Sequence, residues 1–418
     1  MRNLIRCLAA GALVIAFAGP AVAQEVSGEP ISPANENDRV WVYNNLGILT
    51  LQTNDGRFQW FTDARLYIDF GGYWGSERGN SFSNGGSINE ARLALNFTYS
   101  KDWISQIDVS FYGNATEMKD IWIGYTGFKD SLIRVGHFKG PYGLENLISS
   151  RYISFMERPM VSQAFKPGRN IGFAYSRWGK HWQGTVNVFN QGAGDVDETG
   201  EDMGYGYGAR FSVAPILTET SVLHFGISGV VKTPKAASGN TFSLKASNEG
   251  TQDLAKILTT GKIKYVDKNQ VLGLEAAATR GPFYVEAEYA KDEVKRFAGY
   301  AEPSFSGWYA NVGYFLTDDH HPYESQTGEF DRVIPKGKWG AVEVVARYST
   351  LDLNDLAAGV KGGSAKVTSL GMNWYVNYNS RIMFDLARVR TDKYAVGDRP
   401  YKPNDTYNYA QMRFQLNF

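Results

Sequence analysis

Two stretches of the chain concentrate basic side chains at a density that suits anion binding. Between residues 139 and 169, five basic residues accompany only two acids, Glu145 and Glu157, a local excess of three positive charges. The five are Lys139, Arg151, Arg158, Lys166 and Arg169. Cationic groups in a passage of low dielectric constant focus the electric field and raise the local anion concentration. We therefore treat these five residues as a candidate substrate-binding constriction for small anions.

The second basic stretch, residues 232–269, carries seven lysines against three acids, an excess of four positive charges. Its lysines of most interest are Lys232, Lys262 and Lys264. Two interpretations stay open for it, an inward-folded loop or a solvated surface loop. For residues 139–169 we favour an interior position, because apolar residues such as Ile148 and Phe155 need a surface to pack against.

Other reactive clusters are weaker. Residues Asp318, Asp319, His320 and His321 could hold a metal ion, but nothing in the sequence fixes their geometry. The chain has five histidines and no clear nucleophile motif, so an outer-membrane barrel enzyme is only a remote alternative. An adhesin is a second remote alternative. We expect no catalytic residue, no metal and no cofactor.

Composition and targeting exclude further classes. The 43 basic residues balance 43 acidic ones over 418 residues, which argues against a nucleic-acid-binding protein. The single cysteine, Cys7, excludes a disulfide scaffold. Two early arginines, an apolar run and Ala21-Val22-Ala23 predict a secretory signal peptide at residues 1–23. No apolar run of about 18 residues follows, which excludes a helical membrane protein.

The remaining chain alternates with a period of two. From Phe58 to Phe70, one face of an extended strand carries no charge, and the opposite face carries residues such as Arg65 and Asp69. The alternating segments are close to the roughly 9 to 11 residues of a tilted membrane-spanning strand and often end in aromatic residues. The carboxy-terminal segment, residues 407–418, alternates likewise and ends in Phe418. These features predict an all-β, antiparallel transmembrane β-barrel.

We count sixteen strands, an even number in the range whose lumen is aqueous. They are near residues 57–70, 88–99, 103–112, 117–126, 131–139, 170–178, 181–190, 204–214, 221–232, 270–280, 282–291, 303–316, 339–349, 366–377, 380–390 and 407–418. The predicted organisation is a signal peptide at 1–23, a short periplasmic segment at 24–55 and a barrel domain at 56–418.

Loop lengths indicate the orientation. With a periplasmic amino terminus, odd-numbered connections are extracellular and long, and even-numbered ones are tight turns. The connections on the side where long extracellular loops are expected are residues 71–87, 140–169, 191–203, 233–269, 292–302, 350–365 and 391–406. The connection at 317–338 is an exception, because it has 22 residues where a short turn is expected.

Charged strand residues should face the lumen, because a basic side chain facing lipid at mid-membrane costs roughly 2 to 4 kcal/mol. The resulting lumen candidates are Arg57, Arg65, Arg92, Arg210, Arg347 and Arg413. Acids such as Asp69 and Glu343 share these polar faces. Anion preference must then depend on where positive charge concentrates.

Several motifs resemble one family. They are Val135-Gly136-His137-Phe138-Lys139-Gly140-Pro141-Tyr142-Gly143-Leu144-Glu145, Ser149-Ser150-Arg151-Tyr152-Ile153-Ser154-Phe155-Met156-Glu157-Arg158, and Ala164-Phe165-Lys166-Pro167-Gly168-Arg169-Asn170-Ile171-Gly172. The chain resembles the phosphate-selective porin O and P family over essentially its whole mature length.

The resemblance implies a trimeric, sixteen-stranded channel in the outer membrane of a Gram-negative bacterium. It also implies a long periplasmic segment that enters the lumen, which would account for residues 317–338. Basic residues at Lys139, Arg151, Arg158 and Arg169 match the family pattern. We therefore expect passive diffusion of small anions, with inorganic phosphate or polyphosphate as the solute and a general or differently selective porin as the alternative. Expected partners are the anions, outer-membrane lipid and lipopolysaccharide.

Overall fold

The computed structural model describes residues 40–45, 48–112, 116–190, 204–234, 239–398 and 401–418. The predicted signal peptide and the predicted loop at 191–203 lie outside the described residues. No helix among the described residues is long and apolar enough to cross a membrane.

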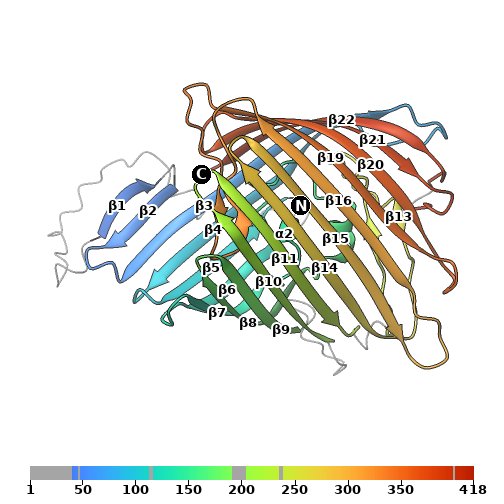
Figure 1. Ribbon diagram of the computed structural model, residues 1–418, viewed down its shortest axis with the longest axis horizontal. Helices are drawn as coiled ribbons and strands as arrows, with labels where there is room; N and C mark the ends of the chain where they lie inside the picture. The colour runs from blue at the N-terminus through green and yellow to red at the C-terminus, as the bar shows by residue number, and fades with distance from the viewer. Residues whose placement is uncertain (1–39, 46–47, 113–115, 191–203, 235–238, 399–400) are drawn as a thin grey trace, which may run out of the picture. The chain divides into compact units, whose positions relative to one another are not determined.

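Sixteen long strands form one antiparallel sheet (Figure 1). They are β3 (Phe58–Trp74), β4 (Gly85–Tyr99), β5 (Trp103–Ser110), β6 (Glu117–Tyr125), β7 (Ser131–Lys139), β8 (Arg169–Gly179), β9 (Trp182–Asn190), β10 (Tyr205–Leu217), β11 (Ser221–Lys232), β14 (Val266–Arg280), β15 (Phe283–Arg296), β16 (Ser304–Phe315), β19 (Ala341–Asp355), β20 (Val360–Tyr375), β21 (Ser380–Thr391) and β22 (Thr406–Asn417). Each corresponds to one predicted strand, so the predicted fold class is confirmed.

The sheet closes on itself. The last strand, β22, pairs antiparallel with β3 over ten residue pairs, from Asn408 opposite Trp74 to Asn417 opposite Arg65. Closure satisfies backbone groups that an open edge would expose to the membrane, where no water is available to pair them.

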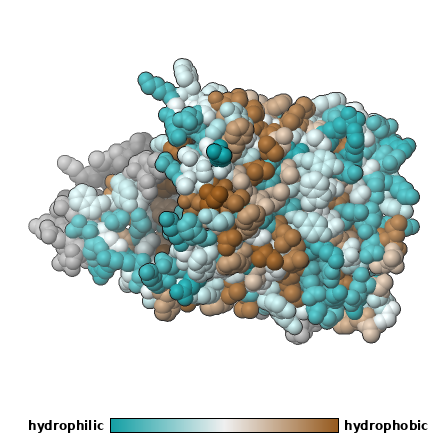
Figure 2. Space-filling view, in the orientation of Figure 1, coloured by the Kyte–Doolittle hydropathy of each residue, from teal (hydrophilic) through white to brown (hydrophobic). Residues whose placement is uncertain are grey.

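Each strand separates polar and apolar side chains as the sequence predicts. On β21, Phe384 and Leu386 are about two-fifths exposed, whereas Met383 and Asp385 are buried. Figure 2 shows hydrophobic residues gathered over the middle of the barrel wall, with hydrophilic residues toward both ends. This is the apolar band that meets acyl chains.

Some predicted loops are strand instead. Strand β19 ends at Asp355 and strand β20 begins at Val360. The long loop predicted at 350–365 is therefore a short connection at 356–359. Strand β15 similarly extends to Arg296. The inner-face residues Leu353 and Ala365 are buried against an inward-folded loop, which supports these longer strands.

A hairpin precedes the barrel. Strands β1 (Val40–Asn45) and β2 (Ile48–Thr53) pair antiparallel, and β2 pairs with the start of β3. The turn that follows holds Arg57, whose side chain is 56% exposed and forms an ion pair with Asp55. The prediction that Arg57 faces the lumen is therefore wrong, because the residue precedes the first spanning strand.

Three connections fold inward and fill part of the barrel. The first insert, residues 140–168, contains α2 (Leu144–Leu147) and α3 (Met160–Phe165). The second insert, residues 233–234 and 239–265, contains β12 (Lys245–Ala246) and β13 (Leu258–Thr259). The third insert, residues 316–340, contains β17 (Tyr323–Glu324) and β18 (Glu329–Phe330).

The two larger buried clusters among the described residues join apolar side chains of the inserts to the inner wall. One joins α3 and the second insert to residues of β15, β16 and β19–β22, including Val294 and Leu353. The other joins Leu144 and Ile148 of the first insert to Tyr284 of β15 and Phe330 of the third insert. The apolar residues of the first insert thus pack inside the barrel, and the 22-residue exception at 317–338 is an insert too.

The barrel seam yields the first prediction. Arg413 of β22 donates to both carboxylate oxygens of Asp69 on β3, each at 2.7 Å, and both side chains are buried. Removing one partner of a buried ion pair costs about 3 to 5 kcal/mol. We expect Arg413→Met to lower the temperature at which the folded, fast-migrating band disappears in SDS gels.

The control is Arg57→Gln, which breaks the ion pair between Arg57 and Asp55. Ion pairs of exposed side chains contribute little to the free energy of unfolding. The double variant Asp69→Leu/Arg413→Met should recover part of the loss, because it leaves no buried charge unpaired. Equal transition temperatures for wild type and Arg413→Met would contradict a stabilising role for this seam pair.

Candidate functional site

A polar cavity of about 610 Å³ lies between the inserts and the inner wall. Its wall residues come mainly from β4 to β10, and the first and third inserts close the opposite side. Ten basic and six acidic residues border it, an excess of four positive charges. The cavity is therefore the candidate passage through the barrel.

The passage lies on this side because the first insert is fastened to the other side. Glu288 of β15 accepts hydrogen bonds from the backbone N–H groups of Leu144 and Glu145, both at 2.8 Å. Asp385 of β21 accepts one from the N–H group of Met156 at 3.0 Å. These carboxylates pair donors that burial would otherwise leave unsatisfied.

Side chains of β19 to β22 pair the carbonyl groups of the same insert, at 2.7 to 3.0 Å. The donors Arg347, Asn373, Arg381, Arg413 and Gln415 bond to the carbonyl oxygens of Glu157, Ser154, Ile153, Met156 and Arg151, respectively. The insert therefore follows the β19–β22 wall, and the β4–β9 wall stays open.

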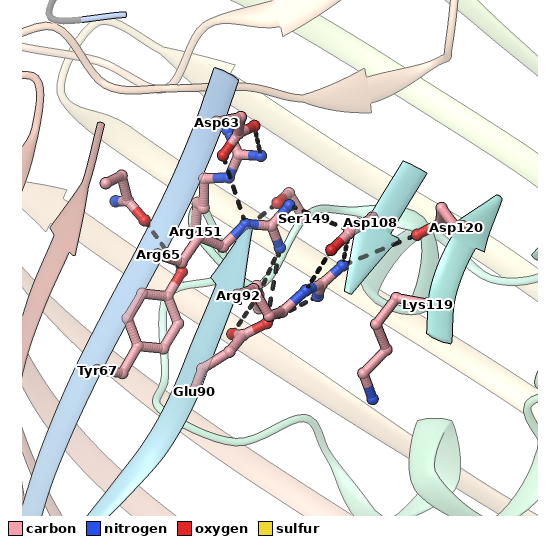
Figure 3. A network of polar contacts seen from close by, with 12 residues as sticks. Asp63, Arg65, Tyr67, Glu90, Arg92, Asp108, Lys119, Asp120, Ser149 and Arg151 are labelled. Atoms are coloured by element: carbon pink, nitrogen blue, oxygen red, sulfur yellow. Dashed lines mark hydrogen bonds and ion pairs between the residues drawn. The ribbon is translucent and has the colours of Figure 1, made fainter. Parts of the chain in front are cut away.

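Most acids on the open wall are neutralised by arginines (Figure 3). Arg92 bonds to Glu90 at 2.7 Å and to Asp108 through Nε at 3.1 Å. Arg169 bonds to Asp120 at 2.7 Å. In these pairs the arginines offset the negative charge of the wall carboxylates, and the arginines' own positive charge is offset in turn.

Four other basic residues border the cavity without a carboxylate within 4.0 Å among the described residues. Lys139 donates to the carbonyl oxygen of Asn146 at 2.6 Å. Arg158 donates to two carbonyl oxygens of its own insert, at 2.7 and 2.6 Å. Arg134 lies over the ring of Phe138 at 4.3 Å. Lys166 is exposed to the lumen. We call these four residues the free-cation group.

The members of the free-cation group are electrostatic neighbours. Arg158 repels both Lys139 and Lys166. Glu329 of the third insert lies near Arg134 and Lys139 and offsets part of their charge. Four cations against this one unpaired acid leave the local potential positive.

Several predicted site residues do not line the cavity. Arg151 forms an ion pair with Asp63, as Figure 3 shows, and Arg347 bonds to Glu145 at 3.0 Å and to Asn311 at 2.9 Å. Both lie inside the barrel but away from the cavity, because their charges are paired in holding the first insert.

The predicted cations of the second stretch are also away from the cavity. The ammonium of Lys232 lies 5.8 Å from the ring centroid of Phe242, a residue of the second insert. Lys262 and Lys264 are exposed, and Ile263 between them is buried. The second insert itself enters the barrel, but it contributes apolar residues rather than free lysines to the interior.

Arg65, Arg210 and Arg413 border the cavity with their charge already engaged. Arg65 donates to Ser150 at 3.3 Å and lies 3.6 Å from Glu90. Arg210 bonds to Glu275 at 2.7 Å and to the carbonyl oxygens of the third insert at 3.0 and 2.9 Å. Of the predicted primary residues, Lys139, Arg158, Lys166 and Arg169 do border the cavity.

Sequence reasoning missed Arg134 and Lys119, which both border the cavity. Arg134 alternates with Ile133 and Val135, and Val135 is 53% exposed on the outer face. The period-two pattern would therefore have placed Arg134 inside. Two of the residues at 318–321 have other partners, because His321 bonds to Glu343 at 2.6 Å and Asp319 accepts the backbone N–H of Lys336 at 2.9 Å.

The comparisons with known proteins agree with this geometry. A model of the phosphate-selective porin O and P family matches residues 62–418. The chain belongs to this family. It is an outer-membrane channel protein, not an enzyme.

Two relatives extend the comparison. The porin is 26% identical to porin O of Pseudomonas aeruginosa, over 91% of this chain and 94% of that one. It is 27% identical to an uncharacterised protein of Caulobacter vibrioides, over 75% of this chain and 64% of that one.

Solved porin structures share the fold. An anion-selective porin of Comamonas acidovorans gives a TM-score of 0.55 at 12% identity, over 86% of this chain and all of that one. The channel DcaP of Acinetobacter baumannii gives 0.52 at 10% identity, over 88% and 99% of the two chains.

Fastening of the first insert yields the second prediction. Glu288→Ala removes the acceptor of two backbone N–H groups and of the Tyr309 hydroxyl at 2.6 Å. We expect the released insert to give larger current fluctuations in single-channel recordings. Glu293→Ala is the control, because Glu293 lies on the outer face of the same strand. Identical noise in both variants would contradict an anchoring role for Glu288.

Proposed function

We propose that this porin is a passive diffusion channel for small anions, with inorganic phosphate as its preferred solute. The observation that carries the proposal is the free-cation group, which borders the cavity while most neighbouring acids are paired with arginines. An unpaired cation beside a water-filled passage lowers the free energy of a passing anion. A positively charged solute is repelled by the same side chain.

The arrangement also suits conduction rather than tight binding. The positive charges come from β7 and from separate parts of the first insert, so an anion meets weak sites in succession. Conduction requires such contacts, because one deep site would block the passage. Family membership supports the same solute class.

Arg134 supports a preference for phosphate. It makes no hydrogen bond to the described residues, and its Nε is buried without a partner. The planar fork of arginine bonds two oxygens of one phosphate at once, whereas the ammonium of lysine acts as a point charge. A single free arginine fork would thus distinguish phosphate from a monatomic anion.

The third prediction tests anion passage. Neutralising the free-cation group with Arg134→Gln, Lys139→Gln, Arg158→Gln and Lys166→Gln should shift the reversal potential in a KCl gradient toward that of K⁺. The shift follows from removing the positive potential of the cavity. Bilayer recordings measure it directly.

The matched control is Lys262→Gln/Lys264→Gln, which removes two exposed lysines that do not border the cavity. This control should keep the wild-type reversal potential. A wild-type channel that prefers K⁺, or a fourfold variant with unchanged permeability ratios, would contradict the proposal.

The fourth prediction concerns phosphate. Arg134→Lys keeps the charge but removes the fork, so chloride conductance should persist while block of chloride current by added phosphate weakens several-fold. Sulfate at equal ionic strength is the comparison. Equal block by phosphate in the wild type and in Arg134→Lys, or a loss of block by sulfate without a loss of block by phosphate, would contradict this role of Arg134.

We also infer that the functional unit is a homotrimer, as the family resemblance implies. One fold relative, OmpT of Vibrio cholerae, was solved in a trimer form, at a TM-score of 0.54 and 10% identity. Native mass spectrometry of the detergent-extracted porin tests this, and a monomer as the dominant species would contradict it.

A further inference from the structure

A groove of about 580 Å³ on the outside of the barrel has no role in the passage described above. It crosses β19 to β22 and β3. Three of its ten bordering residues are basic, Lys366, Arg388 and Arg390, and none is acidic. The remainder includes Trp74 and apolar residues such as Leu370 and Leu386.

These three basic residues face outward. On β21 the outward side chains run from Ile382 through Phe384 and Leu386 to Arg388 and Arg390, with buried residues between them. The same sequence occurs on β20, where Met372 and Leu370 precede Thr368 and Lys366. Both strands thus change from apolar to basic at one level.

This level is the outer boundary of the apolar band. Arg388 is eight residues from Ser380, where β21 begins at the end that the loop lengths predict to be periplasmic. At a rise of about 3.4 Å per residue and a tilt of about 40°, it lies roughly 21 Å above that end, against an apolar band about 25 Å tall. The phosphate groups of outer-leaflet lipids lie at this boundary.

The cluster is unfavourable without an anion. Lys366 lies directly opposite Arg390 in the β20–β21 register, with Arg388 on the same face. Like charges opposite each other across two strands destabilise a sheet. Asp352, on the neighbouring strand, accepts the backbone N–H of Asn354 at 2.9 Å and forms no ion pair with Lys366 within 4.0 Å.

Strand β15 shows the contrasting solution on the outer face. There Lys291 and Lys295 are neutralised by Glu293 and Glu302 at 2.7 to 3.3 Å. Among the described residues, no carboxylate lies within 4.0 Å of Lys366, Arg388 or Arg390. The chain therefore balances one outward basic cluster internally and leaves the other without a counter-ion.

We propose that the groove binds a phosphate group of an outer-leaflet lipid, with the lipid's acyl chains lying along Leu370 and Leu386. Two arginine forks and one ammonium match a phosphate that carries up to two negative charges. The site faces lipid, so it does not depend on which solute passes through the barrel.

The test compares lipid A carrying both phosphates with fully dephosphorylated lipid A, each added to the detergent-solubilised porin and counted by native mass spectrometry. The variant is Lys366→Gln/Arg388→Gln/Arg390→Gln, and Lys291→Gln/Lys295→Gln is the matched control. We expect the variant to bind phosphorylated lipid A at least tenfold more weakly, and the control and wild type to bind it equally. An unchanged folded band in SDS gels and unchanged conductance establish that the variant is intact.

Equal binding of phosphorylated lipid A by variant and wild type would overturn the proposal, as would equal binding of the two lipids by the wild type. Inorganic phosphate at 10 to 100 times the lipid concentration is the third arm. Full displacement of the lipid by it would identify a free-anion site instead. Loss of the oligomer in the variant without any difference in lipid binding would show that the face is a contact between copies of this chain.

Discussion

Backbone groups that enter a barrel must be paired there, and this constraint organises the interior of the porin. The first insert carries a run of peptide groups into the lumen, and side chains of β15 and β19–β22 pair them. Because these partners lie on one part of the wall, the insert follows that part. The passage then takes the space that is left beside β4 to β9.

The same constraint divides the basic residues into two groups. Arg347 and Arg413 project from the wall into the lumen, yet their charge is paired with the carboxylates of Glu145 and Asp69. Arg134 and Lys166 face the cavity with their charge available. We therefore propose that selectivity depends on the cations that remain unpaired once the insert is held. The total number of charges that face the lumen does not determine it.

The sequence was sufficient for the barrel because one rule, alternation with period two, acts independently on each strand. It located all sixteen strands and, on several of them, the inward face, including the faces that carry Arg65 and Arg413. It could not identify partners, because Asp63 is 88 residues from Arg151 and Glu145 is 202 residues from Arg347. It also overlooked Arg134, although the alternation around that residue was readable. The ends of long strands such as β19 were not predicted. Outside the membrane a strand can carry polar residues on both faces, so its sequence resembles that of a loop.

The candidate passage follows the β4–β9 wall, and the first insert covers the β19–β22 wall. Single cysteines test this arrangement, since the chain's only cysteine, Cys7, lies in the predicted signal peptide. Ser110 and Ser176 border the cavity, whereas Ser349 and Ser369 are buried on the inner faces of β19 and β20 and do not border it. A charged, membrane-impermeant thiol reagent should reduce the single-channel current of Ser110→Cys and Ser176→Cys but not of Ser349→Cys and Ser369→Cys. The reverse pattern, or equal reduction at all four positions, would contradict the account.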